Sequence, residues 1–136
     1  MKVTYIEIIE DITRRHPSLS LYGFGKDDHE WISPSNEEAF WAAVQYAQTL
    51  RVSKGYPTRF AATSYGLKHD VEAIGTAKGQ HLYCANGIMI AALIYAEIPF
   101  KLCRDGINAV PRIAASSRFS PMDRQGRRKI DWRIAA

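Results

Sequence analysis

Residues 63–97 decide the fold of this chain, and they read TSYGLKHDVEAIGTAKGQHLYCANGIMIAALIYAE. Asn86 is the predicted N-cap of a helix over 87–97, and Pro99 ends that helix because proline disfavours helical geometry in the residue before it. Apolar side chains surround this helix on most sides. Its apolar run is well short of the roughly 18 residues that cross a membrane. We therefore expect the helix to lie buried at the centre of a folded domain.

Three more helices are predicted, over 4–15, 35–52 and 63–73. Each begins at a serine or threonine, whose hydroxyl accepts a hydrogen bond from the backbone amides of the first turn. Apolar side chains then recur at helical spacing in the first two segments. Gly75 and Gly79 are predicted to bracket the loop after the third helix.

Short β-structure is predicted at three places. Loose alternation over 18–24 predicts a strand and a turn. Asp105-Gly106 lies between two short apolar runs, which predicts a β-hairpin because both residues tolerate positive φ. Alternation over 130–134 predicts a strand that returns to a sheet with 19–24. The predicted fold class is a mainly helical α+β domain over 1–136, with four helices and a small antiparallel hairpin or sheet.

The same order of elements also fits a degenerate winged helix-turn-helix, with 86–97 as the recognition helix and the hairpin as the wing. Two features depart from that pattern. The loop over 74–85 is longer than the three or four residues of a standard turn, and a recognition helix exposes a polar face, which 86–97 lacks.

Positive charge gathers near the C-terminus. The net charge is +4, but residues 1–100 carry 9 Lys and Arg against 11 Asp and Glu, while residues 101–136 carry 9 against 3. We expect a basic arm around 111–129, whose field attracts a polyanion such as nucleic acid. The predicted phosphate contacts are Lys68, Arg104, Arg112, Arg124, Arg127, Arg128 and Lys129.

These features predict a non-enzymatic nucleic-acid-binding accessory protein, with DNA preferred over RNA as the partner. The alternative without a binding partner is a basic tail that only keeps the protein soluble. A second hypothesis is an inhibitory or accessory protein that binds a host protein complex, because acidic residues gather between 27 and 38. Acids at a helix start also complement the helix dipole without any partner.

A third hypothesis is a cysteine-dependent enzyme. Cys84 precedes the predicted start of a helix, which lowers a thiol pKa, and His69 or His81 would serve as its base. The alternative is a buried structural cysteine. Zinc has suitable ligand types in His69, His81, Cys84 and Cys103, but only one closely spaced pair, so we expect no metal and no cofactor.

Two cysteines cannot form a disulfide framework, and the start MKVTYIEIIED lacks the basic and apolar regions of a secretory signal. The expected location is therefore the cytoplasm, without a membrane partner. The sequence does not predict the oligomeric state.

The pattern Thr63-Ser64-Tyr65-Gly66-Leu67-Lys68-His69, followed by an aromatic residue, Asn86-Gly87 and an Ile-Ala-Ala-Leu helix, resembles a signature of small plasmid and mobile-element proteins. The resemblance covers about 35 residues. No activity is attached to that signature. What it implies is context, because mobile-element proteins often act on DNA, on transfer or on host defence.

Overall fold

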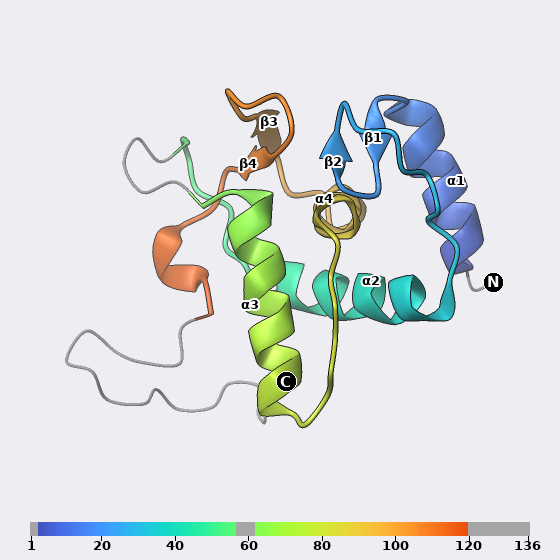
Figure 1. Ribbon diagram of the computed structural model, residues 1–136. Helices are drawn as coiled ribbons and strands as arrows, with labels where there is room; N and C mark the ends of the chain where they lie inside the picture. The colour runs from blue at the N-terminus through green and yellow to red at the C-terminus, as the bar shows by residue number, and fades with distance from the viewer. Residues whose placement is uncertain (1–2, 57–61, 120–136) are drawn as a thin grey trace.

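The computed structural model describes residues 3–56 and 62–119. Its elements confirm the mainly helical α+β class (Figure 1). The helices are α1 (Tyr5–Arg15), α2 (Pro34–Ala47), α3 (Ser64–Ala77), α4 (Asn86–Tyr95) and the 3-10 turn η1 (Ala115–Ser117). The strands are β1 (Leu19–Ser20), β2 (Gly23–Phe24), β3 (Phe100–Leu102) and β4 (Ala109–Pro111). They form two separate antiparallel pairs, β1 with β2 and β3 with β4.

Helix α4 is the centre of the molecule. Figure 1 shows it end-on, with α2 passing below it, α3 at one side and the two hairpins above. All side chains from Ile88 to Leu93 have no exposed surface. The prediction of a buried central helix is therefore confirmed, and the other elements pack around it as expected for an apolar helix.

Gly87 explains how the first hairpin reaches this helix. Its amide donates a hydrogen bond of 2.8 Å to the carbonyl oxygen of Leu21. A Cβ atom at this position would lie 2.0 Å from the Ser20 carbonyl oxygen and 2.6 Å from that of Leu21. Only glycine lets the β1–β2 turn approach the helix backbone so closely.

The structure corrects the bounds of α2. The predicted cap was Ser35, but the side chain of Ser33 accepts the hydrogen bond, at 3.1 Å from the amide of Asn36. Pro34 then occupies the first turn, where its missing N–H costs nothing. The helix ends at Ala47, before the predicted Val52, because Val52 pairs instead with Ile113 in an isolated β-bridge.

Helix α3 is longer than predicted, and Gly75 lies inside it. A Cβ at Gly75 would come within 3.1 Å of the Leu82 Cβ, so this glycine serves close packing and does not mark a loop. The helix ends two residues before Gly79, which has a φ of +79°. Gly79 was predicted at the far end of the loop, but it lies at the start of the loop, just beyond the helix, where a positive φ favours glycine.

The N-cap of α4 also differs from the prediction. Ala85 is the cap residue and makes no side-chain capping bond, while Asn86 is the first helical residue. The Asn86 Nδ2 donates 2.7 Å to the Asn108 Oδ1 and 3.5 Å to the Tyr22 carbonyl. This side chain therefore joins the two hairpins.

The hairpins follow the predicted positions with different turns. The predicted strand and turn over 18–24 is a tight hairpin of two short strands, with Leu19 opposite Phe24. In the second hairpin only Gly106 has a positive φ, of +73°. Asp105 instead accepts hydrogen bonds of 2.8 and 2.9 Å from the amides of Ile107 and Asn108. Both bonds lower the pKa of the Asp105 carboxyl, and the bond from Asn108 has the larger effect.

The predicted strand over 130–134 lies outside the described residues. Within the described ranges, every helix is too short or too polar to cross a membrane.

We predict that Gly87→Ala destabilises the fold by about 3 kcal/mol or more, because the new Cβ has no room beside the β1–β2 backbone. Gly55→Ala is the matched control, since a Cβ at Gly55 meets nothing within 4 Å. Urea unfolding followed by circular dichroism measures both. Equal midpoints for the two variants would contradict the assigned contact.

Candidate nucleic-acid interface

The structure places three of the seven predicted phosphate contacts. Arg104 is exposed in the β3–β4 turn, and Arg112 is half-buried just after β4. Lys68 is buried, with only 7% of its surface exposed, and its ammonium faces a carboxylate. Arg124, Arg127, Arg128 and Lys129 lie outside the described residues. Of the three placed residues, Arg104 and Arg112 belong to one surface, and Lys68 belongs to a separate cluster on α3.

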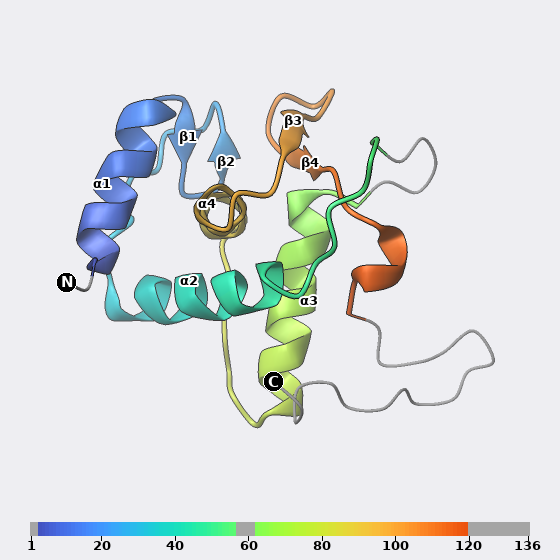
Figure 2. The same cartoon turned by 180° about the vertical axis from the view of Figure 1, so that it is seen from behind.

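Charge is divided between two ends of the molecule. Residues 3–47 contain three Lys and Arg against eight Asp and Glu. Residues 51–56 and 100–119 contain six Lys and Arg against one Asp. Figures 1 and 2 show α1 and the start of α2 at one side, and η1, the β3–β4 hairpin and the segment after α2 at the other.

We call the second of these surfaces the basic edge, made of Arg51, Lys54, Lys101, Arg104 and Arg112. Backbone pairing builds it from segments far apart in the sequence. The Ser53 amide donates 3.1 Å to the Arg112 carbonyl, and the Ala114 amide donates 2.8 Å to the Arg51 carbonyl. The Arg112 amide in turn donates 2.8 Å to the carbonyl of Pro99, beside β3. The segment after α2 and the β3–β4 region, which carry these cations, thus lie side by side.

Two contacts order side chains of the basic edge. The Lys101 Nζ lies 4.8 Å from the centre of the Tyr56 ring, a cation–π distance. The Arg51 Nη2 donates 2.9 Å to the Ser116 Oγ. These contacts hold the charged groups without neutralising them, so both cations remain available to an anion.

Arg118 has a different role, because its charge is used inside the protein. Its Nε and Nη2 donate 3.1 and 3.2 Å to the two oxygens of Asp70 on α3. The Tyr46 hydroxyl donates 2.6 Å to the same carboxylate and accepts 2.9 Å from the Phe119 amide. Within the predicted basic arm around 111–129, Arg118 and Phe119 are therefore held against α2 and α3.

The electrostatics of this network are consistent with its geometry. Burial, followed by the charge of Asp70, raises the pKa of Tyr46, so the phenol stays protonated and donates. Burial is the largest single effect on Arg118 and lowers its pKa, but the hydrogen bonds and the charge of Asp70, together with the smaller effects of Tyr46, raise that pKa overall. The network is thus a paired, partly buried anchor.

A second polar cluster lies on α3 around Glu72. One carboxylate oxygen is 3.4 Å from the Lys68 Nζ and accepts 3.0 Å from the Cys84 amide. The other oxygen is 3.0 Å from the His69 Nδ1. Lys68 is therefore paired, and we do not count it among the cations of the basic edge.

The position of Cys84 does not support the enzyme hypothesis. Its side chain has no exposed surface, and burial, with the nearby charge of Glu72, raises the pKa of the thiol to about 12. His69, one proposed base, faces Glu72. Across 3–56 and 62–119, no three His, Cys, Asp or Glu side chains gather as metal ligands would.

The winged-helix reading lacks an exposed recognition helix. Helix α4 holds the predicted recognition position, but its side chains are the core of the protein.

A cleft of about 520 Å³ lies between α2 and α3, apart from the basic edge. Trp41 and Tyr95 meet edge-to-face at 5.8 Å on one of its walls, and Ile74 and Leu82 line another. Lys78 is the cation among its lining residues, and Glu38 is an acid there. The cleft is therefore not a cationic site.

Three residues of the basic edge were not among the predicted phosphate contacts: Arg51, Lys54 and Lys101. Arg51 and Lys54 were missed because they are distant in sequence from the C-terminal third. One signal was present: residues 51–69 contain no Asp or Glu.

Comparison of the chain with protein-family models, with curated proteins and with solved structures found no match.

We predict that Tyr46→Phe lowers the free energy of unfolding by about 2–3 kcal/mol, because the lost hydroxyl serves a charged carboxylate and the Phe119 amide. Tyr5→Phe is the matched control. Its buried hydroxyl donates 2.8 Å to the neutral carbonyl of Trp31, so about 1 kcal/mol is expected. Urea unfolding measures both, and equal losses would contradict the anchoring role of Tyr46.

We predict that Cys84 resists alkylation in the folded protein from pH 6 to about 9, because a thiol with a raised pKa carries little thiolate in that range. The Cys103→Ser variant isolates Cys84, and mass spectrometry follows iodoacetamide addition over time. Modification should become fast only in denaturant. A rate in the folded protein that rises near neutral pH would restore the enzyme hypothesis.

Proposed function

We propose that the protein is a non-enzymatic accessory protein that binds nucleic acid through the basic edge. The observation that carries this proposal is the backbone pairing that joins two segments distant in the sequence, around 51–54 and 101–114, which together carry five Lys and Arg. Lys and Arg that neutralise phosphates release condensed counterions, which supplies sequence-independent affinity. Such contacts position a protein on nucleic acid without reading bases.

The remaining predicted contacts are consistent with this placement. Four of them come after Phe119 in the sequence: Arg124, Arg127, Arg128 and Lys129. Phe119 ends the described segment whose Ser117 hydroxyl accepts a hydrogen bond from the Arg51 amide. We expect DNA to be preferred over RNA. The resemblance of 63–97 to mobile-element proteins supports a role in a plasmid or another mobile element, and the cysteine count supports a cytoplasmic location.

A protein partner is the second candidate, favoured by the acidic end of the molecule. Asp27, Asp28, Glu30, Glu37 and Glu38 would dock on a basic surface of a host protein or nucleoprotein complex. Purification of the untagged protein before and after a high-salt wash separates the candidates. Nucleic acid that is lost on washing supports the first, and a protein that is retained supports the second.

We predict that the triple variant Lys54→Gln, Lys101→Gln and Arg104→Gln loses more than tenfold in affinity for DNA at about 0.1 M salt. The slope of log K against log salt should fall by about 0.9 for each lost phosphate contact. Fluorescence anisotropy of labelled DNA over a salt series measures both quantities.

The matched control is Arg14→Gln, Arg15→Gln and Lys26→Gln, which removes the same charge from the acidic end. We expect less than a threefold effect, because those side chains lie outside the basic edge. A second variant, Arg127→Ala with Arg128→Ala, tests the C-terminal cations in the same assay. Undetectable binding at low salt, or equal losses in both triple variants, would refute the proposal.

A further inference from the structure

Two exposed tyrosines share one buried lysine on the surface of α3. Tyr65, in the first turn of α3, is 52% exposed, and Tyr83, before α4, is 60% exposed. The Lys68 Nζ lies 5.4 Å from the centre of the Tyr65 ring and 5.1 Å from that of Tyr83. We call Tyr65 and Tyr83 the tyrosine pair.

The rings of the tyrosine pair are held in place by charge and packing. The Lys68 side chain is only 8% exposed, and Glu72 fixes its ammonium between the rings. The Tyr65 ring also meets the His69 ring edge-to-face, with centroids 4.6 Å apart. Rings that are already ordered lose little conformational entropy when a ligand binds them.

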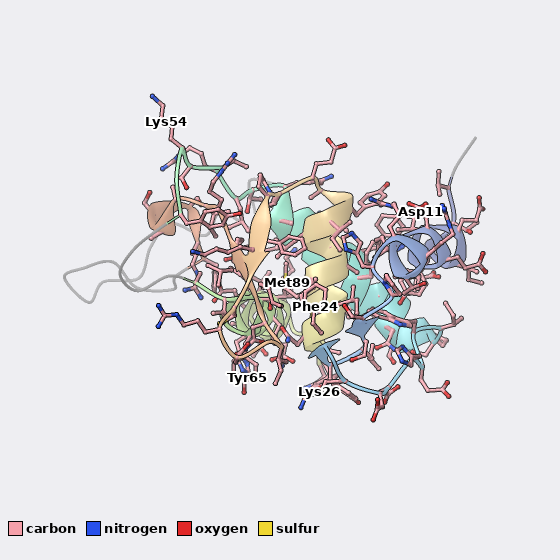
Figure 3. All side chains as sticks on the ribbon, turned by 90° about the horizontal axis from the view of Figure 1, so that it is seen from above. Asp11, Phe24, Lys26, Lys54, Tyr65 and Met89 are labelled. Atoms are coloured by element: carbon pink, nitrogen blue, oxygen red, sulfur yellow. The ribbon has the colours of Figure 1, made fainter. Side chains whose placement is uncertain are left out.

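The tyrosine pair adjoins the β4 end of the basic edge. The Ala109 amide of β4 donates 3.0 Å to the Ser64 Oγ, beside Tyr65. Figure 3 shows Tyr65 at the rim of the molecule, beside the β3–β4 hairpin. A chain of phosphates along the hairpin would thus bring its bases near the two rings.

The cluster itself adds little attraction for phosphate. Glu72 neutralises Lys68, so the exposed chemistry here is two aromatic faces and the His69 ring. Aromatic faces beside a cationic track are the arrangement that binds single-stranded nucleic acid, because every base has a π-face to stack. A duplex hides those faces inside its own stack.

We propose that Tyr65 and Tyr83 stack on unpaired bases of a single-stranded nucleic acid whose phosphates contact the basic edge. This inference rests on the proposed function and adds the strand type that the protein prefers. Lys68 and Glu72 are positioning residues in it, because they hold the rings and do not contact phosphate.

The test uses the full chain and three labelled probes of one mixed sequence, about 16 nucleotides long: single-stranded DNA, single-stranded RNA and duplex DNA. The variants are Tyr65→Ala, Tyr83→Ala and the phenylalanine replacement at each position. Tyr22→Ala is the matched control, since Tyr22 is a 44% exposed tyrosine in the β1–β2 turn. Fluorescence anisotropy gives the affinities, and circular dichroism verifies that each variant is folded.

Each alanine variant should lose about tenfold in affinity for the single strands and little for the duplex. The salt slope should stay unchanged, because a stacked ring releases no counterions. Phenylalanine should restore binding, since it keeps the aromatic face, and Tyr22→Ala should have no effect. The DNA and RNA arms show which single strand is preferred.

Two failures are distinguishable. If neither single strands nor duplex bind at low salt, the proposed function fails and the stacking inference fails with it. If the probes bind with a salt slope but the alanine variants match the wild type, or if duplex binding falls equally, stacking alone is overturned.

Discussion

The hydrogen bond from the Gly87 amide to the Leu21 carbonyl is the constraint on which the rest of this fold depends. This bond requires a residue without a side chain at the start of the helix, and it holds the β1–β2 hairpin against the buried helix α4. The neighbouring Asn86 then reaches Asn108 of the second hairpin, and the Asn108 Nδ2 donates 2.6 Å to Asp105. One buried helix start therefore fixes both hairpins, and the second hairpin carries part of the basic edge.

The two ends of the molecule differ in how well local structure explains their charge. Glu7 and Glu37 lie in the first turns of α1 and α2, and Arg14 and Arg15 close α1 while pairing with Asp11. Such charges stabilise helix termini without any partner. Lys54 and Arg104, in contrast, lie exposed at turns outside the helices. Positive charge in the basic edge thus has less local explanation, and the proposed nucleic-acid partner would account for it.

The features of the fold and the site that could be predicted from sequence are those that depend on residues close together in the chain. The helix start at Thr4, whose hydroxyl accepts 3.2 Å from the Glu7 amide, and the burial of α4 followed from local spacing, and both are confirmed. The end of α3 did not, because Gly75 packs against Leu82, a contact that only the folded chain creates. Likewise, Arg104 and Arg112 were found by counting charge, whereas Arg51 joins them through backbone pairing some 60 residues away in sequence. The burial of Lys68 could not be predicted either, because Glu72 on α3 and Tyr83 in the segment before α4 both contact it.

Glu72 shows why one cluster favours a binding surface over a catalytic one. Its carboxylate accepts the Cys84 amide, which fixes the segment that carries Tyr83 against α3. The same negative charge adds to the effect of burial in raising the pKa of the Cys84 thiol. A catalytic thiol needs a cation or a free base beside it. The cation here, Lys68, is instead paired with Glu72 and lies between two tyrosine rings. The interactions that keep the thiol protonated are therefore the ones that hold two aromatic faces toward solvent.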